Sequence, residues 1–411
     1  MNESAERLLV DWLAEGPDRS SPEAVERAMA ATRRTSQRPG WTIPERWLPM
    51  QLAMRPAVQP AGTRRLFLIV AVALLALALA ATALFIGSRQ RIAPPFGPAA
   101  NGSIVVGVDG HLWLADRNGM DARQLFIGQA LASSPTYSPD GTRLAFKSRD
   151  VAWNPSSIWV ADADGSSARS VTGEFPIVAG DLAWSADSSA IVFSSSDRGI
   201  NRLYRVDLRG GPPHALTDRS GDRSSPALSP DGQWLAYQSR ATSGPSRVSL
   251  MVSRPDGSAE RELVFIPRGG SSYIALQWAP GSDRIAYMRS DPSGHVVATV
   301  DLEGNETQVS RPGEDAVNPS WSPDGLRLAY IGSPGTGSFV LDTANPSDRI
   351  HIPSAMTDCG IAWSPDGSFL LGIDEPCTGL YVIPIDDPEA ARQIDMPEGL
   401  IDFTSWQRTA P

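Results

Sequence analysis

The chain has 411 residues, of which 41% are hydrophobic and 20% are charged, as in an ordinary globular protein. Glycine and proline are both frequent, with 36 and 35 residues, which favours short strands and tight turns over long helices. Residues 92–411 carry 24 basic and 38 acidic side chains, a net charge of −14, so this part is expected to repel nucleic acid.

Residues 1–38 are predicted to form a small helical segment, because apolar residues recur at helical spacing in two stretches. The first stretch is residues 5–14, and the second begins at Ser21, a typical N-cap, with Pro22 in the first helical position. Five prolines follow between residues 39 and 65 and exclude a helix of any length there. We therefore expect a proline-rich tether after the helical segment.

Residues 66–88 form an uncharged apolar run of 23 residues, which is long enough to cross a bilayer core of about 30 Å as a helix. A buried helix is the alternative, but few soluble helices are apolar on every face. A cleaved signal peptide is disfavoured because 65 residues precede the run. Four arginines lie in the twenty residues before the run and two in the twenty after it, so the positive-inside rule places the N-terminus in the cytoplasm.

The sequence thus predicts a single-pass protein of the cell membrane. Residues 89–101 are expected to be a proline-rich linker, and the part from residue 102 onward is expected to lie outside the cytoplasm.

The four letters SPDG recur at intervals in the forties through the C-terminal part, and two altered copies fill the gaps. Proline fixes φ at the first central position of a tight turn, aspartate accepts backbone hydrogen bonds beside it, and glycine takes the left-handed position that follows. Regular spacing of this size predicts a repeat architecture, in which the turn is a structural element and not a catalytic motif. The copies are Ser138–Gly141, Ser229–Gly232, Ser322–Gly325 and Ser364–Gly367, with turn residues Asp140, Gly141, Asp231, Gly232, Asp324, Gly325, Asp366 and Gly367, and the altered copies are 185–188 and 279–282.

Each repeat reads as four short strands in about forty residues, which is typical of a β-propeller blade. Second and third strands can each be found seven times, but first strands only six times. The missing first strand is matched by residues 401–409, which can pair into the first blade and close the ring. We predict an all-β fold: a closed seven-bladed propeller over 102–409, preceded by one transmembrane helix and the small helical segment. The predicted second strands are 102–108, 142–148, 189–195, 233–239, 283–289, 326–332 and 368–374.

Tryptophan recurs at one position of the first strand. We expect these side chains to fill the space between adjacent blades, with carbohydrate stacking as the alternative. They are Trp184, Trp278, Trp321, Trp363 and, in the closing strand, Trp406.

The letters WSPDG at 321–325 and 363–367, each followed by a strand, resemble the WD40-like or PD40 repeats of TolB-type β-propellers. The resemblance covers residues 102–409 and implies the propeller fold. It implies function only broadly, because such propellers serve as binding platforms, as lids over hydrolases and as sensor domains. TolB itself is a soluble periplasmic protein with six blades and an additional α/β domain, so a Tol–Pal role is not expected of this chain.

Cys359 and Cys377 are the only two cysteines, and both lie in the predicted outer domain, where an oxidising compartment permits a disulfide. They flank the predicted hairpin around Ser364–Gly367, so a bond between them would join its two ends. Two unpaired buried thiols are the alternative. A structural zinc site is disfavoured, because two cysteines without nearby histidines provide too few ligands.

The sequence contains no Gly-x-Ser-x-Gly elbow and no phosphate-binding glycine-rich loop, and Lys147 is its only lysine. Residues 162–166, DADGS, resemble the start of a calcium loop but coincide with a predicted hairpin turn. The histidines lie in different predicted blades, which disfavours a shared metal site. We therefore predict no catalytic residue, no cofactor and no metal. The histidines are His111, His214, His295 and His351.

Three hypotheses of function follow. The preferred one is a membrane-anchored extracytoplasmic propeller that binds an envelope protein, peptide or glycan without catalysis. The second is a transmembrane regulator of the anti-sigma type, with a propeller sensor and a cytoplasmic client bound by residues 1–38. Residues 1–65 lack the histidine and cysteine ligands of many zinc-type anti-sigma domains. The third is an enzyme with its site at the central opening of the ring.

Overall fold

The computed structural model describes residues 96–125, 131–149, 157–173, 175, 182–197, 199–218, 220–242, 247–266, 275–291 and 294–410. The predicted helical segment (1–38), tether (39–65), apolar span (66–88) and first part of the linker lie outside the described residues. Within the described ranges the helices are two short 3₁₀ turns, η4 (Ser354–Met356) and η5 (Pro388–Ala390), and neither could cross a membrane.

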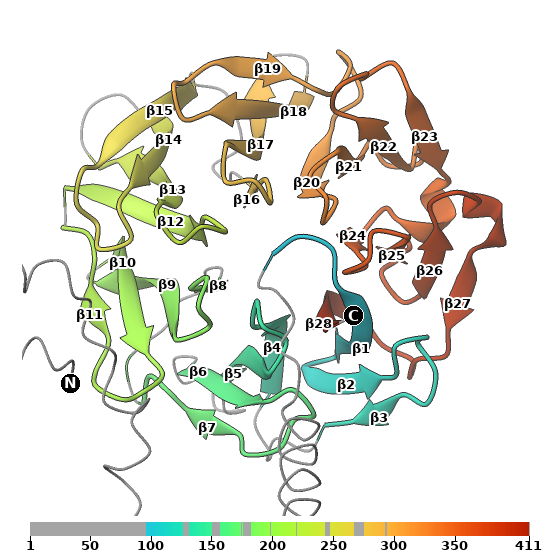
Figure 1. The fold of residues 1–411 in the computed structure, drawn as a ribbon, viewed down its shortest axis with the longest axis horizontal. Helices are drawn as coiled ribbons and strands as arrows, with labels where there is room; N and C mark the ends of the chain where they lie inside the picture. The colour runs from blue at the N-terminus through green and yellow to red at the C-terminus, as the bar shows by residue number, and fades with distance from the viewer. Residues whose placement is uncertain are drawn as a thin grey trace, which may run out of the picture. The chain divides into compact units, whose positions relative to one another are not determined.

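The described strands form seven four-stranded antiparallel sheets arranged in a ring, which confirms the predicted seven-bladed propeller (Figure 1). Every predicted second strand overlaps an observed one. The sheets are, from the channel outward, blade 1 with β28 (Ile401–Thr409), β1 (Ala100–Val108), β2 (His111–Ala115) and β3 (Arg123–Gln124); blade 2 with β4 (Leu131–Tyr137), β5 (Arg143–Arg149), β6 (Ser157–Asp162) and β7 (Arg169–Ser170); blade 3 with β8 (Leu182–Trp184), β9 (Ala190–Asp197), β10 (Ile200–Asp207) and β11 (His214–Ala215); blade 4 with β12 (Gly221–Leu228), β13 (Leu235–Ala241), β14 (Val248–Ser253) and β15 (Arg261–Ile266); blade 5 with β16 (Leu276–Trp278), β17 (Arg284–Asp291), β18 (Gly294–Asp301) and β19 (Glu306–Gln308); blade 6 with β20 (Val317–Trp321), β21 (Arg327–Ile331), β22 (Ser338–Asp342) and β23 (Arg349–Ile352); and blade 7 with β24 (Gly360–Trp363), β25 (Phe369–Ile373), β26 (Leu380–Pro384) and β27 (Arg392–Ile394).

The second strands are apolar on both sides because a blade is covered by a neighbour on each face. In β9, for example, Ile191, Val192 and Phe193 are all fully buried, although successive side chains of a strand point in opposite directions. A continuous apolar run in this position is therefore a consequence of the ring.

The SPDG turn closes the first hairpin of its blade with a fixed set of hydrogen bonds. In blade 2 the Ser138 amide donates to the Arg143 carbonyl over 2.9 Å, and the Ser138 hydroxyl donates to Asp140 Oδ1 over 2.6 Å. The same carboxylate accepts the Thr142 amide over 3.0 Å. Gly141 has a φ of +70°, the left-handed conformation that favours glycine.

The two altered copies of the turn carry serine where the others carry glycine, and this serine links neighbouring blades. Ser188 and Ser282 have φ values of +57° and +60°. The Ser188 hydroxyl accepts the Asp140 amide of blade 2 over 3.2 Å, and the Ser282 hydroxyl accepts the Asp231 amide of blade 4 over 2.9 Å. The hydroxyl thus offsets the cost of a left-handed non-glycine residue with an additional hydrogen bond.

A second set of contacts between blades comes from an arginine on the outermost strand, which the sequence analysis missed. Its guanidinium donates to a backbone carbonyl in the outer turn of the next blade. The letters Ala-Arg at 122–123, 168–169 and 391–392 are the signal that could have revealed it. The pairs are Arg123 with Asp164, Arg169 with Leu208, Arg261 with Leu302, and Arg392 with Asn118.

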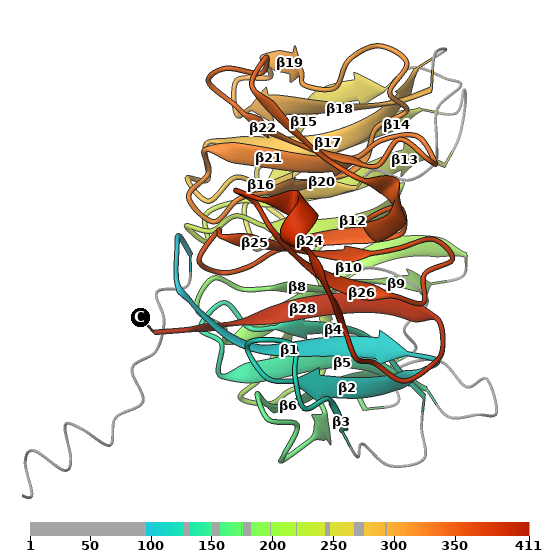
Figure 2. The ribbon, with the colours of Figure 1, turned by 90° about the vertical axis from the view of Figure 1, so that its right-hand side faces the viewer.

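The ring closes as predicted, through pairing of β28 with β1. The register runs from Ala100 opposite Thr409 to Val108 opposite Ile401. Figure 2 shows β28, in red, lying alongside the blue-green β1 although some 300 residues separate them in sequence. Because β1 begins at Ala100, the propeller starts two residues before the predicted boundary at 102.

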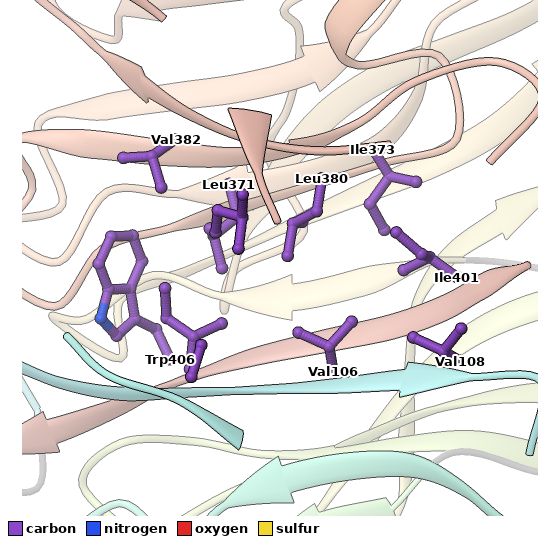
Figure 3. Close-up of a cluster of buried hydrophobic side chains, with 11 residues drawn as sticks. Val106, Val108, Leu371, Ile373, Leu380, Val382, Ile401 and Trp406 are labelled. Atoms are coloured by element: carbon purple, nitrogen blue, oxygen red, sulfur yellow. The ribbon is translucent and has the colours of Figure 1, made fainter. Parts of the chain in front are cut away.

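The repeated tryptophans fill the space between blades, as predicted. Trp406 lies against Leu371 and Val382 of blade 7, together with Val106 of blade 1 (Figure 3). Its indole N–H donates to the Gly102 carbonyl over 2.9 Å. The indole groups of Trp184, Trp278 and Trp363 donate to carbonyls of the first strand in the preceding blade, whereas the buried indole nitrogen of Trp321 has no hydrogen-bond partner in the described part of the chain.

Candidate functional site

The propeller has two different faces. The turn face carries the six SPDG-type turns and the outer turns between third and fourth strands. The hairpin face carries the loops between second and third strands and the connections between blades. The C-terminal end of β28 and the start of β1 both lie at the turn face, on the left in Figure 2.

A cavity of about 650 Å³ opens at the turn face in the centre of the ring. Its walls come from the first strands, and its rim includes the proline of four turns. Arg408 is the one charged side chain among the described residues that line it, and burial lowers the pKa of this guanidinium. The channel mouth is therefore an amphipathic surface of tryptophan, proline, serine and amide side chains. The rim prolines are Pro230, Pro280, Pro323 and Pro365.

Residues 96–101, which we term the entry segment, lie at this mouth. Phe96 and Gly97 belong to the lining of the channel cavity, and the start of the described chain reaches the middle of the ring in Figure 1. On its other side the segment borders a second cavity of about 710 Å³, whose lining includes Pro98 and Arg117. The last residues of the predicted linker are thus part of the turn face.

A third cavity, of about 1190 Å³, lies between blades 1 and 2 on the turn face. Its lining is polar, with five aspartates and three arginines. Burial opposes the charge of Asp116, but the amides of Met120 and Asn118 donate to this carboxylate, and together they lower its pKa. The Ser166 hydroxyl and amide lower the pKa of Asp164 in the same way. These two aspartates accept hydrogen bonds within their own turns and give the groove fixed negative charge. The charged lining residues are Asp116, Asp121, Asp140, Asp162, Asp164, Arg123, Arg143 and Arg408.

Buried or partly buried charged groups occur in blades 4, 5 and 6. Glu314 accepts hydrogen bonds from the Tyr330 hydroxyl over 2.6 Å and from the Arg349 guanidinium over 2.7 Å. Burial, followed by the contact with Glu314, raises the pKa of Tyr330 above its ordinary value of 10.0. In blade 5 the Tyr287 hydroxyl donates to Glu306, and burial again raises the tyrosine pKa.

A third such cluster lies in blade 4. The side chain of Arg223 is 5% exposed and donates to Glu260 over 2.9 Å, beside the buried Tyr237. The sequence signal for all three clusters is the aromatic residue of the second strand, which is tyrosine in blades 4 to 6 and phenylalanine in blades 2 and 3. The carboxylates of these clusters are partly exposed, at 16% for Glu314, 31% for Glu306 and 32% for Glu260, whereas the tyrosine side chains beside them are buried.

The structure places the candidate turn residues apart from one another. Asp140, Asp231, Asp324 and Asp366 each accept hydrogen bonds within their own turn, and each turn belongs to a different blade. The glycines that follow them, Gly141, Gly232, Gly325 and Gly367, all have positive φ.

Cys359 and Cys377 form a disulfide on the hairpin face, with Cα atoms 5.5 Å apart. Cys359 precedes β24, and Cys377 lies in the turn between β25 and β26, so the bond ties the first strand of blade 7 to its second hairpin. The Cys377 carbonyl accepts the Ile401 amide over 2.7 Å. The disulfide therefore lies beside the first residue of the closing strand.

The histidines lie on separate blades, and the described residues contain no group of three histidine, cysteine or acidic side chains placed to hold a metal ion. The His295 amide donates to Asp315 Oδ1 over 2.7 Å, and the His295 Nδ1 atom lies 2.7 Å from the same oxygen. The amide first and the ring second lower the pKa of Asp315. Within DADGS (162–166), the Ser166 hydroxyl donates to Asp164 over 2.6 Å. The segment is thus a hairpin turn whose side chains bond to one another.

The comparisons with known proteins agree with this architecture. The family model of the TolB beta propeller domain, PD40, matches residues 103–367. The chain belongs to the TolB β-propeller domain family. Among curated proteins, the Tol-Pal system protein TolB of Desulfosudis oleivorans is 32% identical over 118 residues, which are 29% of this chain and 23% of that protein. The uncharacterized peptidase YuxL of Bacillus subtilis is 25% identical over 151 residues, 28% of this chain and 23% of that one. The chain thus spans about a quarter of the length of these two relatives.

Solved structures share the fold of this TolB-type propeller. An oligogalacturonate lyase from Vibrio parahaemolyticus has a TM-score of 0.53 at 14% identity and covers 72% of this chain and 86% of its own. The tricorn protease has a TM-score of 0.54 at 13% identity and covers 74% of this chain and 35% of its own. Because both identities are low, the likeness concerns the fold alone.

Proposed function

We propose that the protein is a single-pass membrane protein whose extracytoplasmic TolB-type propeller binds a protein, peptide or glycan of the cell envelope without catalysis. The observation that carries the proposal is the turn face, where three cavities adjoin. The channel mouth and the groove between blades 1 and 2 share Arg408, and the channel mouth and the side cavity share Trp406. A surface with several connected hollows and mixed polar and aromatic walls suits an extended ligand.

The membrane anchor in this proposal rests on the uncharged run 66–88, and the orientation rests on the arginines before it. The disulfide between Cys359 and Cys377 supports an oxidising compartment for the propeller.

The test uses the full-length protein in lipid nanodiscs, incubated with envelope extracts, peptide arrays and glycan arrays. We expect saturable binding that is weakened when Gln277 and Asn318, two exposed residues of the channel lining, are replaced together, with no change in the chemical structure of the bound ligand. Turnover of an array component by the purified protein would contradict the absence of catalysis and favour an enzyme at the channel.

A second function, a transmembrane regulator, is favoured by one observation. The entry segment lies at the channel mouth and leads back toward residues 66–88, so a ligand at the mouth could act on the chain that leads to the membrane. Capture of a transcription or signalling protein by residues 1–38, in the full-length protein, would support the regulator over the simple platform.

A further inference from the structure

The side cavity, the hollow of about 710 Å³ between blades 7 and 1, has the lining of a small-molecule site. It lies on the turn face and shares no lining residue with the groove between blades 1 and 2. Its volume falls within the range of about 300–1,000 Å³ that is typical of ligand pockets. Its walls combine apolar side chains with amide and charged groups, a mixture that can both hold and orient a ligand.

One wall of the side cavity is apolar and includes an aromatic ring. Phe369, the first residue of β25, is partly exposed and lines the cavity together with Pro98. The Phe369 ring lies against the buried Trp406, with the two ring centroids 6.4 Å apart, so the packing between blades 7 and 1 fixes its position. An aromatic ring that is held in place and partly open can pack against the apolar face of a sugar ring.

The rim of the side cavity is rich in hydrogen-bond donors. Arg117 and Arg392 both line the cavity, and both are exposed. A guanidinium group has five N–H donors, and Arg392 gives one of them to the Asn118 carbonyl. This bond places the Arg392 guanidinium beside the outer turn that carries Arg117. Within the described ranges of the chain, neither guanidinium forms an ion pair with a carboxylate.

The carboxylates near the rim already accept hydrogen bonds from the protein. Asp366 Oδ1 accepts the Ser364 hydroxyl over 2.6 Å and the Ser368 amide over 2.9 Å. The other oxygen, Oδ2, accepts the side-chain amide of Asn101 over 2.9 Å. Asp116, which lines the groove instead of the side cavity, accepts two backbone amides of its own turn over 2.8 and 2.7 Å. The groups that remain for a ligand are therefore mainly N–H donors, and a matching ligand must supply acceptors.

The charge of the side cavity is opposite to the charge of its surroundings. Its described lining carries two arginines and one aspartate, whereas the lining of the groove carries five aspartates and three arginines. Residues 92–411 as a whole carry a net charge of −14. Most of the propeller therefore repels an anionic group, and the side cavity attracts it. A guanidinium group can bind a carboxylate or phosphate through two parallel hydrogen bonds.

We propose that the side cavity between blades 7 and 1 binds a sugar unit that carries an anionic group, with the sugar ring against Phe369 and the anionic group on Arg117 and Arg392. The inference rests on the proposed function and names its ligand class, an acidic glycan. A sugar is favoured over an acidic peptide, because one aromatic face beside two guanidinium groups matches the apolar face and the anionic group of a single sugar unit. An extended peptide requires a row of hollows or an open strand edge.

The test is isothermal titration calorimetry on the full-length protein in lipid nanodiscs. The probe is cellobiouronic acid, a disaccharide with one carboxylate, and neutral cellobiose is the matched control ligand. We expect cellobiouronic acid to bind saturably and cellobiose to bind roughly 10-fold more weakly, because hydrogen bonds to charged groups are stronger than those to neutral groups. A tetraglutamate peptide supplies carboxylates without a sugar ring, and it should bind no better than cellobiose.

Three variants of the protein locate the site. Arg117→Gln removes an exposed guanidinium, and it should weaken binding of cellobiouronic acid roughly 10-fold and leave binding of cellobiose unchanged. Phe369→Leu keeps an apolar side chain in β25 but removes the ring, and it should weaken binding of both disaccharides by roughly 2- to 10-fold. Arg209→Gln is the matched control, because Arg209 is an exposed arginine in the outer turn of blade 3. This variant changes the net charge equally and should bind both disaccharides as the wild type does.

The inference is overturned if cellobiouronic acid shows no saturable binding, if cellobiose binds equally well, or if Arg117→Gln and Arg209→Gln bind alike. Tetraglutamate binding as tightly as cellobiouronic acid would replace the glycan with an acidic peptide and would also overturn it. The proposed function fails separately. An envelope ligand whose binding is unchanged in Arg117→Gln would keep the function and remove the inference. Binding of cellobiouronic acid that depends on Arg117, in a protein that retains no envelope ligand, would keep the site and remove the function.

Discussion

The junctions between blades 3 to 6 differ from the junctions around the ring closure, between blades 7, 1 and 2. In the first group a buried ionic cluster, such as Glu314 with Arg349 and Tyr330, fills part of the space between the sheets. Apolar side chains pack at both groups of junctions, and around the ring closure they include Leu371, Val106 and Trp406 (Figure 3). The difference shows that the second-strand aromatic residue of blades 5 and 6 adds a hydrogen bond of its hydroxyl group to the apolar packing that all junctions share.

The largest effect is expected from breaking an ionic cluster. Glu314→Ala leaves the Arg349 guanidinium buried without its carboxylate, since the two side chains are 16% and 8% exposed. We expect the free energy of unfolding to fall by about 3–5 kcal/mol. Chemical denaturation measures it, with Asp283→Ala as the control, because the side chains of its pair with Arg284 are 46% exposed on the arginine and 56% on the aspartate, and its loss should matter by less than about 1 kcal/mol. Equal losses in the two variants would contradict the distinction between buried and exposed pairs.

The closing junction should instead be sensitive to steric change at Gly141. A Cβ atom there would lie 1.8 Å from the Arg408 carbonyl oxygen of the closing strand, whereas at Gly367 the nearest atom would be 3.7 Å away. Both glycines have positive φ, so alanine carries the same conformational cost at each. Gly141→Ala should therefore lower the free energy of unfolding by about 2–4 kcal/mol, against about 1 kcal/mol for Gly367→Ala.

Thermal unfolding of the two glycine variants measures this difference. Similar midpoints would mean that β28 does not lie against the first turn of blade 2, and the closure through Arg408 would be wrong.

Alkaline pH should act on blade 2 and on blades 4 to 6. Burial raises the pKa of Tyr137, Tyr237, Tyr287 and Tyr330 above the unfolded value of 10.0. Because the folded state binds the tyrosine protons more tightly than the unfolded state, the contribution of these tyrosines to stability is fully present below pH 10.0. It is lost as the pH rises above this value. Denaturation midpoints measured between pH 8 and 11.5 should fall at the alkaline end. The fall should be smaller in Tyr330→Phe, and an unchanged pH profile in that variant would remove Tyr330 from the account.

The smallest effect concerns two tryptophans that differ in one hydrogen bond. Trp406 donates its indole N–H to Gly102, whereas the indole N–H of Trp321 has no partner within the described residues. Phenylalanine removes a similar apolar area at both sites, so Trp406→Phe should cost about 1 kcal/mol more than Trp321→Phe. Equal costs would mean that Trp321 also has a partner, such as a bound water, which can be checked by hydrogen exchange of the two indole protons.

Much of the fold could be predicted because single residues of the repeat determine the local backbone geometry. The sequence of Ser138–Gly141 specifies a turn. The sequence of 401–409 resembles a first strand but is followed by no further blade, so it was available to close the ring. The altered turns were harder to interpret, since the Ser188 hydroxyl accepts a hydrogen bond from the Asp140 amide of the neighbouring blade, far away in sequence. Local pattern carries no information on such a contact.

The candidate site could not be predicted for the same physical reason. The entry segment reads as a proline-rich linker, and only the closed ring brings Asn101 to Asp366 and Phe96 to the channel mouth. The disulfide partners could be named because the protein has only two cysteines. The ionic clusters had a weak signal, the change from phenylalanine to tyrosine along the second strands. Their acidic partners share no position in the repeat, because Glu260 and Glu314 lie in connections and Glu306 begins an outer strand.

The most direct test of the account is photo-crosslinking of the full-length protein in its native membrane from one position on each face of the propeller. A photoreactive residue at Asn118, in the lining of the side cavity on the turn face, is compared with one at Thr336 on the hairpin face. The account predicts an envelope protein or glycan crosslinked from Asn118, with little crosslinking from Thr336. Crosslinks that form only from Thr336 would contradict a binding platform at the turn face.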